Sequence, residues 1–315
     1  MERITLTTPS SDGYELLDSG REEKLERFGD VILRRPDPQA LWEKKLGEEE
    51  WQKANGVYVR ETGEAGKWTG KLGKEWQIEF GGLKFLIKPT SFKHTGLFPE
   101  QLSNWEWMTE RIQEVRGSVS QADGSRSSEF STENYATPES LPVSAQKVLN
   151  LFGYTGGASL AAAKAGASVT HVDASKSAVT WASENAKLSG LGEAPIRWIV
   201  EDVTLFVRRE IARGNKYDAI IMDPPAFGHG PKDEIWKIEQ NLLELIELCG
   251  QLLSDTPLFF LINGYAAGYS PLAFAYNLEQ FEKKFGGSIE YGDLEIAEKG
   301  SGRVLPAGIF ARWKK

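Results

Sequence analysis

The feature that most constrains the fold is a regular alternation of short apolar runs and helical segments, which begins near Gln146. Five apolar runs have the length of buried strands, and helix-forming segments separate them: KVLNLF, SVTHVD, IRWIVED, YDAIIMD and PLFFLIN. Such alternation indicates a mostly parallel sheet with helices on both faces. Two final segments, SIEYGDLEIA and GIFARWKK, are expected to form an antiparallel pair. The sequence therefore predicts an α/β fold.

The first hundred residues follow a different pattern. Short runs such as VILRR and EWQIEFGGLKFLIKP are apolar or alternating, and Gly, Asp and Pro separate them, which is typical of strands. A helix is expected over 99–115, and the Ser-, Gly- and acid-rich stretch 116–142 has the composition of a linker. We therefore expect a small β-rich domain over 1–98, a connecting helix and linker over 99–145, and an α/β domain over 146–315.

Composition limits the class of protein further. The single cysteine, Cys249, allows no internal disulfide, and no run reaches the roughly 18 apolar residues of a membrane helix. The first residues lack the basic start and apolar run of a secretory signal. We expect a cytoplasmic protein that does not span a membrane. The three histidines, His94, His171 and His229, are scattered, so no metal site is expected.

The net charge of −8 argues against a protein that coats nucleic acid, but it does not exclude a local basic face. Such a face is one interpretation of the span 53–93, where eight Lys and Arg stand against four Glu. The alternative is a solvated β surface.

A Gly-rich turn follows the first apolar run, over 150–157 (NLFGYTGG). Ligands bind an open parallel sheet beyond the carboxyl ends of its strands, so this turn is a candidate site. Its glycines let the backbone pass close to a ligand, and the next helix starts with free N–H groups. The alternative is a turn that serves packing alone. The turn lacks G-x-G-x-x-G and a phosphate-loop lysine, which disfavours a dinucleotide.

Acidic residues follow the next two apolar runs. Asp173 lies 23 residues beyond Asn150, where a carboxylate can accept both hydroxyls of a ribose. Asp202 follows the third run and can accept a hydrogen bond from an adenine amino group. For both residues the alternative is a cap for the following helix, through Asp173 or Ser175 in the first case.

The segment 223–228 (DPPAFG) follows the fourth run. Its two prolines favour a rigid, extended loop, and its carbonyls and the Asp223 carboxylate can accept hydrogen bonds from an amine. Phe227 can stack on a planar base. These features suit methyl transfer, because a sulfonium is already a good leaving group and positioning supplies most of the rate. The alternative is a simple Asp-Pro turn.

Three stretches carry a family resemblance: VLNLFGYTGGASLAAAKAGASVTHVDAS, SENAKLSGL and IIMDPPAFG. They resemble class I S-adenosylmethionine (SAM)-dependent methyltransferases related to bacterial 23S ribosomal RNA methyltransferases, which include cytosine-C5 and guanine methylating members. The stretch KHTGLFPEQLSNWEWM is similar to the connecting segment of that group. The resemblance covers most of the chain outside 116–142. It implies a Rossmann-like domain with seven strands, the last antiparallel, and SAM as cofactor.

The resemblance also implies site residues. The catalytic set, which would face the transferred methyl, is Asp223, Pro224, Pro225 and Phe227. The residues that would close over the cofactor from the connecting segment are Lys93, Thr95, Gly96, Leu97 and Phe98. The alternative for this segment is an ordinary strand-to-helix turn. The cofactor-binding set is Thr95, Gly96, Phe98, Asn150, Phe152, Gly153, Tyr154, Thr155, Gly156, Asp173, Ala174, Ser175, Asn185, Asp202, Val203 and Asp223.

One departure from the family narrows the chemistry. Members that methylate cytosine C5 attack the base with a cysteine after strand five, where this chain has 261–265 (LINGY). Because Cys249 lies on the preceding predicted helix, a thiolate adduct is disfavoured. We expect methylation of a base nitrogen of RNA, with Asn263, Tyr265 and Tyr269 shaping the acceptor pocket or packing a loop.

Other functions stay open at this point. They are methylation of a small molecule or protein side chain, a cofactor-binding module without catalysis, and a dehydrogenase. The oligomeric state stays open too, and a homodimer is one possibility.

Overall fold

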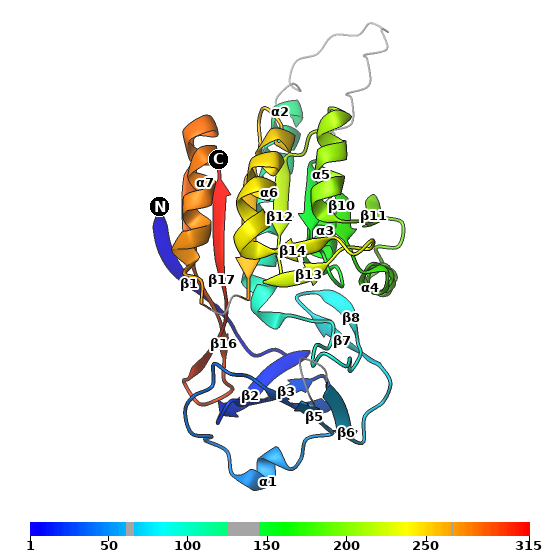
Figure 1. Cartoon of the computed structure of the whole chain (residues 1–315), viewed down its shortest axis with the longest axis vertical. Helices are drawn as coiled ribbons and strands as arrows, with labels where there is room; N and C mark the ends of the chain where they lie inside the picture. Colours follow the sequence, from blue (N-terminus) through cyan, green and yellow to red (C-terminus); the bar gives the residue numbers. More distant parts are fainter. Residues whose placement is uncertain (61–65, 125–144, 266–267) are drawn as a thin grey trace, which may run out of the picture.

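The computed structural model describes residues 1–60, 66–124, 145–265 and 268–315, with 116–124 described by backbone only. Figure 1 shows two parts, an α/β layer in the upper half and a smaller β unit below it. The hairpin β7 (Trp76–Phe80) and β8 (Leu83–Ile87) lies between them.

The α/β layer is built on one eight-stranded sheet, in the order β1-β16-β17-β15-β12-β9-β10-β11. All neighbours pair in parallel except β17, which is antiparallel to both β15 and β16. The α/β prediction and the antiparallel pairing of the two final segments are confirmed. The strands are β1 (Glu2–Thr8), β9 (Lys147–Leu151), β10 (Ser168–Asp173), β11 (Ile196–Val200), β12 (Ala219–Met222), β15 (Phe259–Gly264), β16 (Ser288–Ala297) and β17 (Val304–Lys314).

The expected count of seven strands is corrected by β1. This strand pairs in parallel with the outer edge of β16 over seven residue pairs, so residues near the N-terminus complete the sheet. The predicted boundaries 1–98, 99–145 and 146–315 stay a prediction, with the difference that 2–8 belong to the larger sheet.

Helices cover both faces of the sheet. Alternate residues of the central strands point to opposite faces and pack against different helices. Val148 and Ile221 pack with α2 and α3, whereas Leu149 and Ile220 pack with α5, α6 and α7. The helices are α1 (Glu48–Trp51), the 3-10 helix η1 (Pro99–Gln101), α2 (Leu102–Gly124), α3 (Gly157–Lys164), α4 (Lys176–Leu188), α5 (Val203–Ala212), α6 (Ile238–Leu252) and α7 (Pro271–Phe285).

The β unit holds a second sheet, of five strands in the order β2-β3-β4-β5-β6. The β-rich character expected for the first hundred residues is therefore present. The strands are β2 (Tyr14–Gly20), β3 (Glu23–Phe28), β4 (Val31–Pro36), β5 (Gly56–Arg60) and β6 (Gly66–Gly70).

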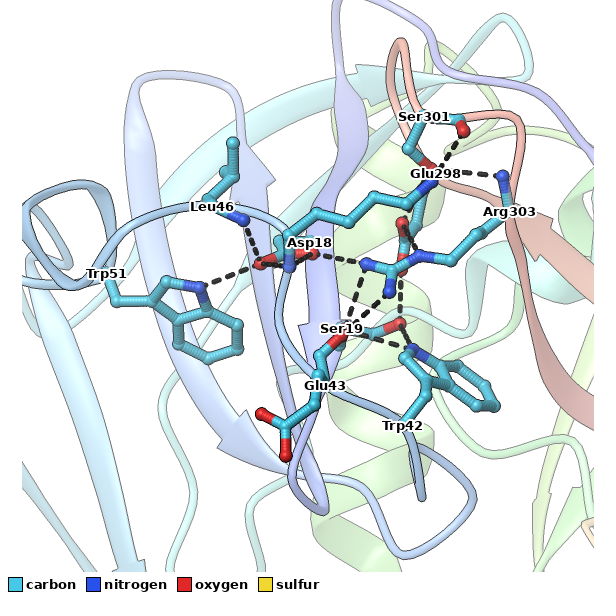
Figure 2. Close-up of polar contacts among 10 residues, drawn as sticks. Asp18, Ser19, Trp42, Glu43, Leu46, Trp51, Glu298, Ser301 and Arg303 are labelled. Atoms are coloured by element: carbon cyan, nitrogen blue, oxygen red, sulfur yellow. Dashed lines mark hydrogen bonds and ion pairs between the residues drawn. The ribbon is translucent and has the colours of Figure 1, made fainter.

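A buried polar network ties the β unit to the β16–β17 hairpin (Figure 2). Asp18 of β2 accepts hydrogen bonds from the Trp51 indole at 2.9 Å and the Arg303 guanidinium at 2.6 Å. Arg303, in the turn between β16 and β17, also pairs with Glu298 at 2.7 Å. Since Asp18 and Glu298 are both buried, each depends on Arg303 for charge compensation.

Two predicted boundaries are wrong. Helix α2 continues to Gly124, so 116–124 are helical and not linker, and the remainder of that stretch, 125–142, lies outside the described residues. The sequence pattern from about Asp233 to Leu253 predicts one long helix, but helix α6 begins only at Ile238, because β13 (Phe227–His229) and β14 (Ile235–Lys237) pair as a hairpin. Among the described residues, no helix is long and apolar enough to cross a membrane.

Candidate functional site

The Gly-rich turn lies at the carboxyl end of β9, next to the end of β10. Phe152, Tyr154 and Gly156 adopt left-handed backbone conformations with φ of 56°, 47° and 91°, which fold the turn tightly. The Asp173 carboxylate accepts hydrogen bonds from the backbone N–H of Tyr154 at 2.9 Å and of Ser175 at 2.8 Å. Asp173 therefore holds the turn in place and still has acceptor capacity for a ligand.

Two glycines of the turn are required for packing. A Cβ on Gly153 would lie 2.4 Å from the His171 ring, and a Cβ on Gly157 would lie 2.3 Å from the Trp105 ring. The packing interpretation therefore applies to these two positions.

A chain of buried hydrogen bonds next to the turn connects β9, α3 and β10. The Asn150 amide donates to Ser159 Oγ at 2.8 Å, and Ser159 Oγ lies 2.9 Å from His171 Nδ1. Burial lowers the pKa of His171 to about 3, so this ring is neutral and serves the core. The chain fixes the orientation of Asn150, which faces the candidate site.

A cleft of about 460 Å³ opens at the carboxyl ends of β9, β12 and β15. From the predicted set, the residues that line it are Gly96, Phe98, Asn150, Phe152, Gly153, Tyr154, Thr155 and Asp223. Further lining residues are Phe85, Leu97, Gln101, Trp105, Gly157, Ala158, Ile221 and Asn263.

The connecting segment closes one side of the cleft. Thr155 Oγ1 donates to the Gly96 carbonyl at 2.6 Å, and the Phe98 and Tyr154 rings lie 5.4 Å apart. A Cβ on Gly96 would lie 2.1 Å from the Trp181 ring, so no other residue fits there. Segment 95–98 is thus packed directly on the Gly-rich turn.

Asn185 acts behind the cleft instead of lining it. This buried amide donates to the Thr155 carbonyl at 2.9 Å and accepts from the Leu86 N–H at 2.9 Å. It thereby joins the turn to β8 and positions Thr155. Thr95 is also buried and outside the lining of the cleft.

Asp223 stands at the end of β12 with its side chain in the cleft. Burial raises its pKa to about 6, and no hydrogen bond to its carboxylate forms within the described part of the chain. Asn263, at the end of β15, lines the same cleft, where its side-chain oxygen accepts from Asn104 at 2.8 Å. These two polar side chains lie at the ends of neighbouring strands.

The rest of the Asp-Pro-Pro loop points elsewhere. The Pro225 carbonyl accepts from the Trp236 indole at 2.7 Å, which fixes the loop to β14. Phe227 is 55% exposed and lies 5.1 Å from the His229 ring, edge to face, outside the cleft. Pro224 is buried. Only Asp223 of the predicted catalytic set lines the cleft.

Several other predicted cofactor residues form helix starts. Asp202 caps α5 by accepting from the Leu205 N–H at 2.9 Å, and Ser175 caps α4 by accepting from Ala178 at 3.3 Å. Neither they nor Gly156, Asp173, Ala174 and Val203 line the cleft.

Five lining residues were missed by sequence reasoning: Phe85, Gln101, Trp105, Ala158 and Ile221. A signal existed for two of them, because Phe98, Gln101 and Trp105 follow the spacing of one helical face. Trp105 stacks on Phe85 at 5.7 Å, and both are buried.

Cys249 lies in the core, and burial raises its pKa. Among the described residues, no group of three or more His, Cys, Asp and Glu could hold a metal ion.

Comparison with known proteins defines the class. The family described as S-adenosylmethionine-dependent methyltransferase matches residues 140–274. A solved SAM-dependent methyltransferase from Agrobacterium tumefaciens is similar over 99% of this chain and 95% of that one, with 36% identity and a TM-score of 0.86. The chain belongs to the SAM-dependent methyltransferases, and SAM is its cofactor.

Two curated relatives match over shorter stretches. A ribosomal RNA large subunit methyltransferase I from Aeromonas salmonicida is 44% identical over 85 residues, which are 27% of this chain and 22% of that protein. A ribosomal RNA large subunit methyltransferase K from Neisseria meningitidis is 26% identical over 197 residues, 62% of this chain and 47% of that protein. The chain thus spans less than half the length of either relative.

Proposed function

We propose that this enzyme methylates a base nitrogen of RNA, and that its cofactor occupies the cleft beside the Gly-rich turn. The observation that carries this proposal is Asp223, the single carboxylate among the residues that line the same cleft as the turn. Bound SAM supplies an electrophilic methyl group. The chain then needs to hold an acceptor nitrogen in line with that methyl, which is a task of positioning.

The residues around the cleft suit this cofactor chemically. Asp173 keeps acceptor capacity beyond its two backbone bonds, as a ribose diol requires. Asp202 uses one carboxylate oxygen as a helix cap and keeps the other for an adenine amino group. Asn150, Gly153 and Tyr154 line the cleft itself.

Asp223 would accept a hydrogen bond from the acceptor amine and orient its lone pair. Its pKa of about 6 leaves it ionised at neutral pH, where it is a strong acceptor in a site of low polarity. Asn263 can accept or donate a second bond to the acceptor. Because Cys249 is buried in the core with a raised pKa, it supplies no nucleophile, which favours nitrogen over cytosine C5.

RNA is favoured as acceptor by the names of the curated relatives and by exposed aromatic side chains that could stack on bases. These are Phe92, Phe227, Tyr265 and Tyr269. The basic span 53–93 contributes less than its count suggests, since Lys53 pairs with Glu50 and Lys88 with Glu184. A cytoplasmic location is part of this proposal, and a small molecule or protein acceptor is the alternative.

The test uses methyl-labelled SAM with total RNA, protein extract or the small-molecule fraction, each from cells that lack this protein. We expect label in RNA, and an N-methylated nucleoside after digestion to nucleosides. Label confined to the protein or small-molecule fraction would refute RNA as acceptor, and a C5-methylated pyrimidine would refute the nitrogen assignment. The Asp223→Ala variant serves as the negative control for methyl transfer.

A further inference from the structure

A second cavity, of about 500 Å³, adjoins the cofactor cleft on the side of the β unit. We call it the acceptor cavity. Leu97 and Phe98 line both spaces, so the two share one wall. The rest of the acceptor cavity is formed by residues of β3, of β4 and directly after β4, by the connecting segment, by Tyr265 after β15 and by Ala307 of β17.

Two of its cations are already neutralised. Glu26 accepts two hydrogen bonds from the Arg35 guanidinium, at 2.7 and 2.8 Å. Lys24 lies 3.5 Å from Glu26 and 3.3 Å from Asp37. These side chains form a compensated cluster on one side of the cavity.

Lys93 is different. Its ammonium forms no ion pair with any carboxylate in the described ranges, and it lies 5.8 Å from the centre of the Tyr265 ring. Its carbonyl accepts from Arg35 at 3.0 Å, and its φ of 60° is unusual for a lysine, so the backbone is held in an uncommon conformation. Burial and the neighbouring cations Lys24, Arg35 and Arg60 lower its pKa. An anion placed beside this ammonium would relieve that repulsion.

The cavity also lies close to the carboxylate of the cofactor cleft. Glu100 lines the acceptor cavity, and burial raises its pKa to about 7, with a further contribution from the charge of Asp223. The two carboxylates are therefore within electrostatic reach of each other. A group bound in the acceptor cavity lies one wall away from the cleft that holds Asp223.

Aromatic rings complete the lining. Phe98 lines the cavity from the shared wall. Tyr265, which follows β15 and is 49% exposed, lines it next to Lys93. A base offers a planar face to such rings, and its phosphate offers the anion that Lys93 lacks.

We propose that the acceptor cavity receives one nucleotide extruded from an RNA strand, with its base against Phe98 and Tyr265 and a phosphate on Lys93. Enzymes that modify a base take it out of the stack, which requires a pocket of this kind beside the cofactor. This inference rests on the proposed RNA acceptor, and it adds the location of the site and its recognition residues.

The test measures binding of a random-sequence, fluorescein-labelled RNA pentamer to the whole protein saturated with S-adenosylhomocysteine. Lys93→Ala should weaken binding about tenfold, Lys93→Arg should restore most of it, and the salt slope of Lys93→Ala should fall by about one. Tyr265→Ala should weaken binding by a similar factor, whereas Tyr265→Phe keeps the ring. S-adenosylhomocysteine affinity should stay unchanged in all four, which shows that the fold is intact.

The matched control is Lys283→Ala, which removes one exposed lysine of α7 and should leave pentamer binding unchanged. Equal binding by wild type and Lys93→Ala overturns the cavity assignment, even where RNA is labelled in the methyl-transfer assay. Loss of binding in Lys93→Ala with label confined to protein or small molecules supports the cavity and refutes RNA as the methyl acceptor. The two proposals can thus fail separately.

Discussion

The two sheets differ in the kind of side chain that fills their centres. In the large sheet, β12 buries four apolar residues in succession, Ala219–Met222, because helices cover both of its faces. In the β unit, the centre includes Glu26 and Arg35, paired with each other, and Tyr14 donates to Glu26 at 2.8 Å. In the large sheet, Asn150 of β9 and His171 of β10 are buried but neutral and hydrogen-bonded through Ser159, and the carboxylates Asp173 and Asp223 stand at strand ends.

The two regions therefore differ in whether they bury an ion pair at the centre of the sheet. A buried ion pair costs much of its Coulomb attraction in lost hydration, so it is weak evidence for stability. In this molecule Arg35 of the pair lines the acceptor cavity, whereas the large sheet contributes the ends of its strands to the cofactor cleft. The two regions should therefore respond differently to substitution.

The largest expected effect is in the β unit. Arg35→Met leaves Glu26 buried without its main partner and should lower the free energy of unfolding by about 3–5 kcal/mol. The double variant Glu26→Met/Arg35→Met should recover a large part of that loss. Urea unfolding of wild type and of these two variants measures both effects. As the counterpart, Ile221→Val in the large sheet should cost about 0.5–1.5 kcal/mol, and an equal cost at both positions would contradict the comparison.

At the edge of the large sheet, the effect should fall on turnover. Asp223→Ala should lower the rate of methyl transfer by about 10²–10³-fold, since it removes an acceptor that orients the substrate amine. SAM affinity, measured by calorimetry, should change by less than about threefold. Transfer at the wild-type rate would show that Asp223 is not the orienting group.

Asp223 should also make stability depend on pH. Its pKa is raised to about 6 by burial, so the folded protein holds this proton between pH 4 and 6 while the unfolded chain has lost it. Its stabilising contribution is full below about pH 4 and is lost as the pH rises through about 6. Asp223→Asn cannot ionise, so its stability relative to wild type should rise over that window by about 1–3 kcal/mol.

Unfolding midpoints of both proteins at pH 4, 6 and 8 check this prediction. A difference that stays constant across the three pH values would mean that Asp223 has an ordinary pKa.

The smallest effect concerns Asp202, whose cap role is visible in the structure and whose adenine contact is proposed. Asp202→Ala should destabilise by about 1 kcal/mol through the lost cap of α5, whereas Asp202→Asn should keep the cap. Both should weaken SAM binding several-fold, because neither offers a free carboxylate oxygen to an adenine amine. Unchanged SAM affinity in both variants would leave Asp202 with the cap alone.

Local patterns determined much of the architecture. The alternation of apolar runs and helices was enough to predict the α/β sheet, because buried parallel strands need helical crossovers and apolar faces. The Gly-rich turn and Asp223 were found for a related reason, since the carboxyl ends of parallel strands meet at one edge.

The tertiary structure decided what local patterns could not carry. It brought Glu2–Thr8 beside β16, almost 290 positions away, and it set Phe85 against Trp105 at the cofactor cleft. It also assigned Asn185 to the support of Thr155, and it created the acceptor cavity from β3, β4 and the connecting segment. These contacts join segments that are distant in sequence. They depend on how whole layers pack, and the periodicity of a single segment does not contain that information.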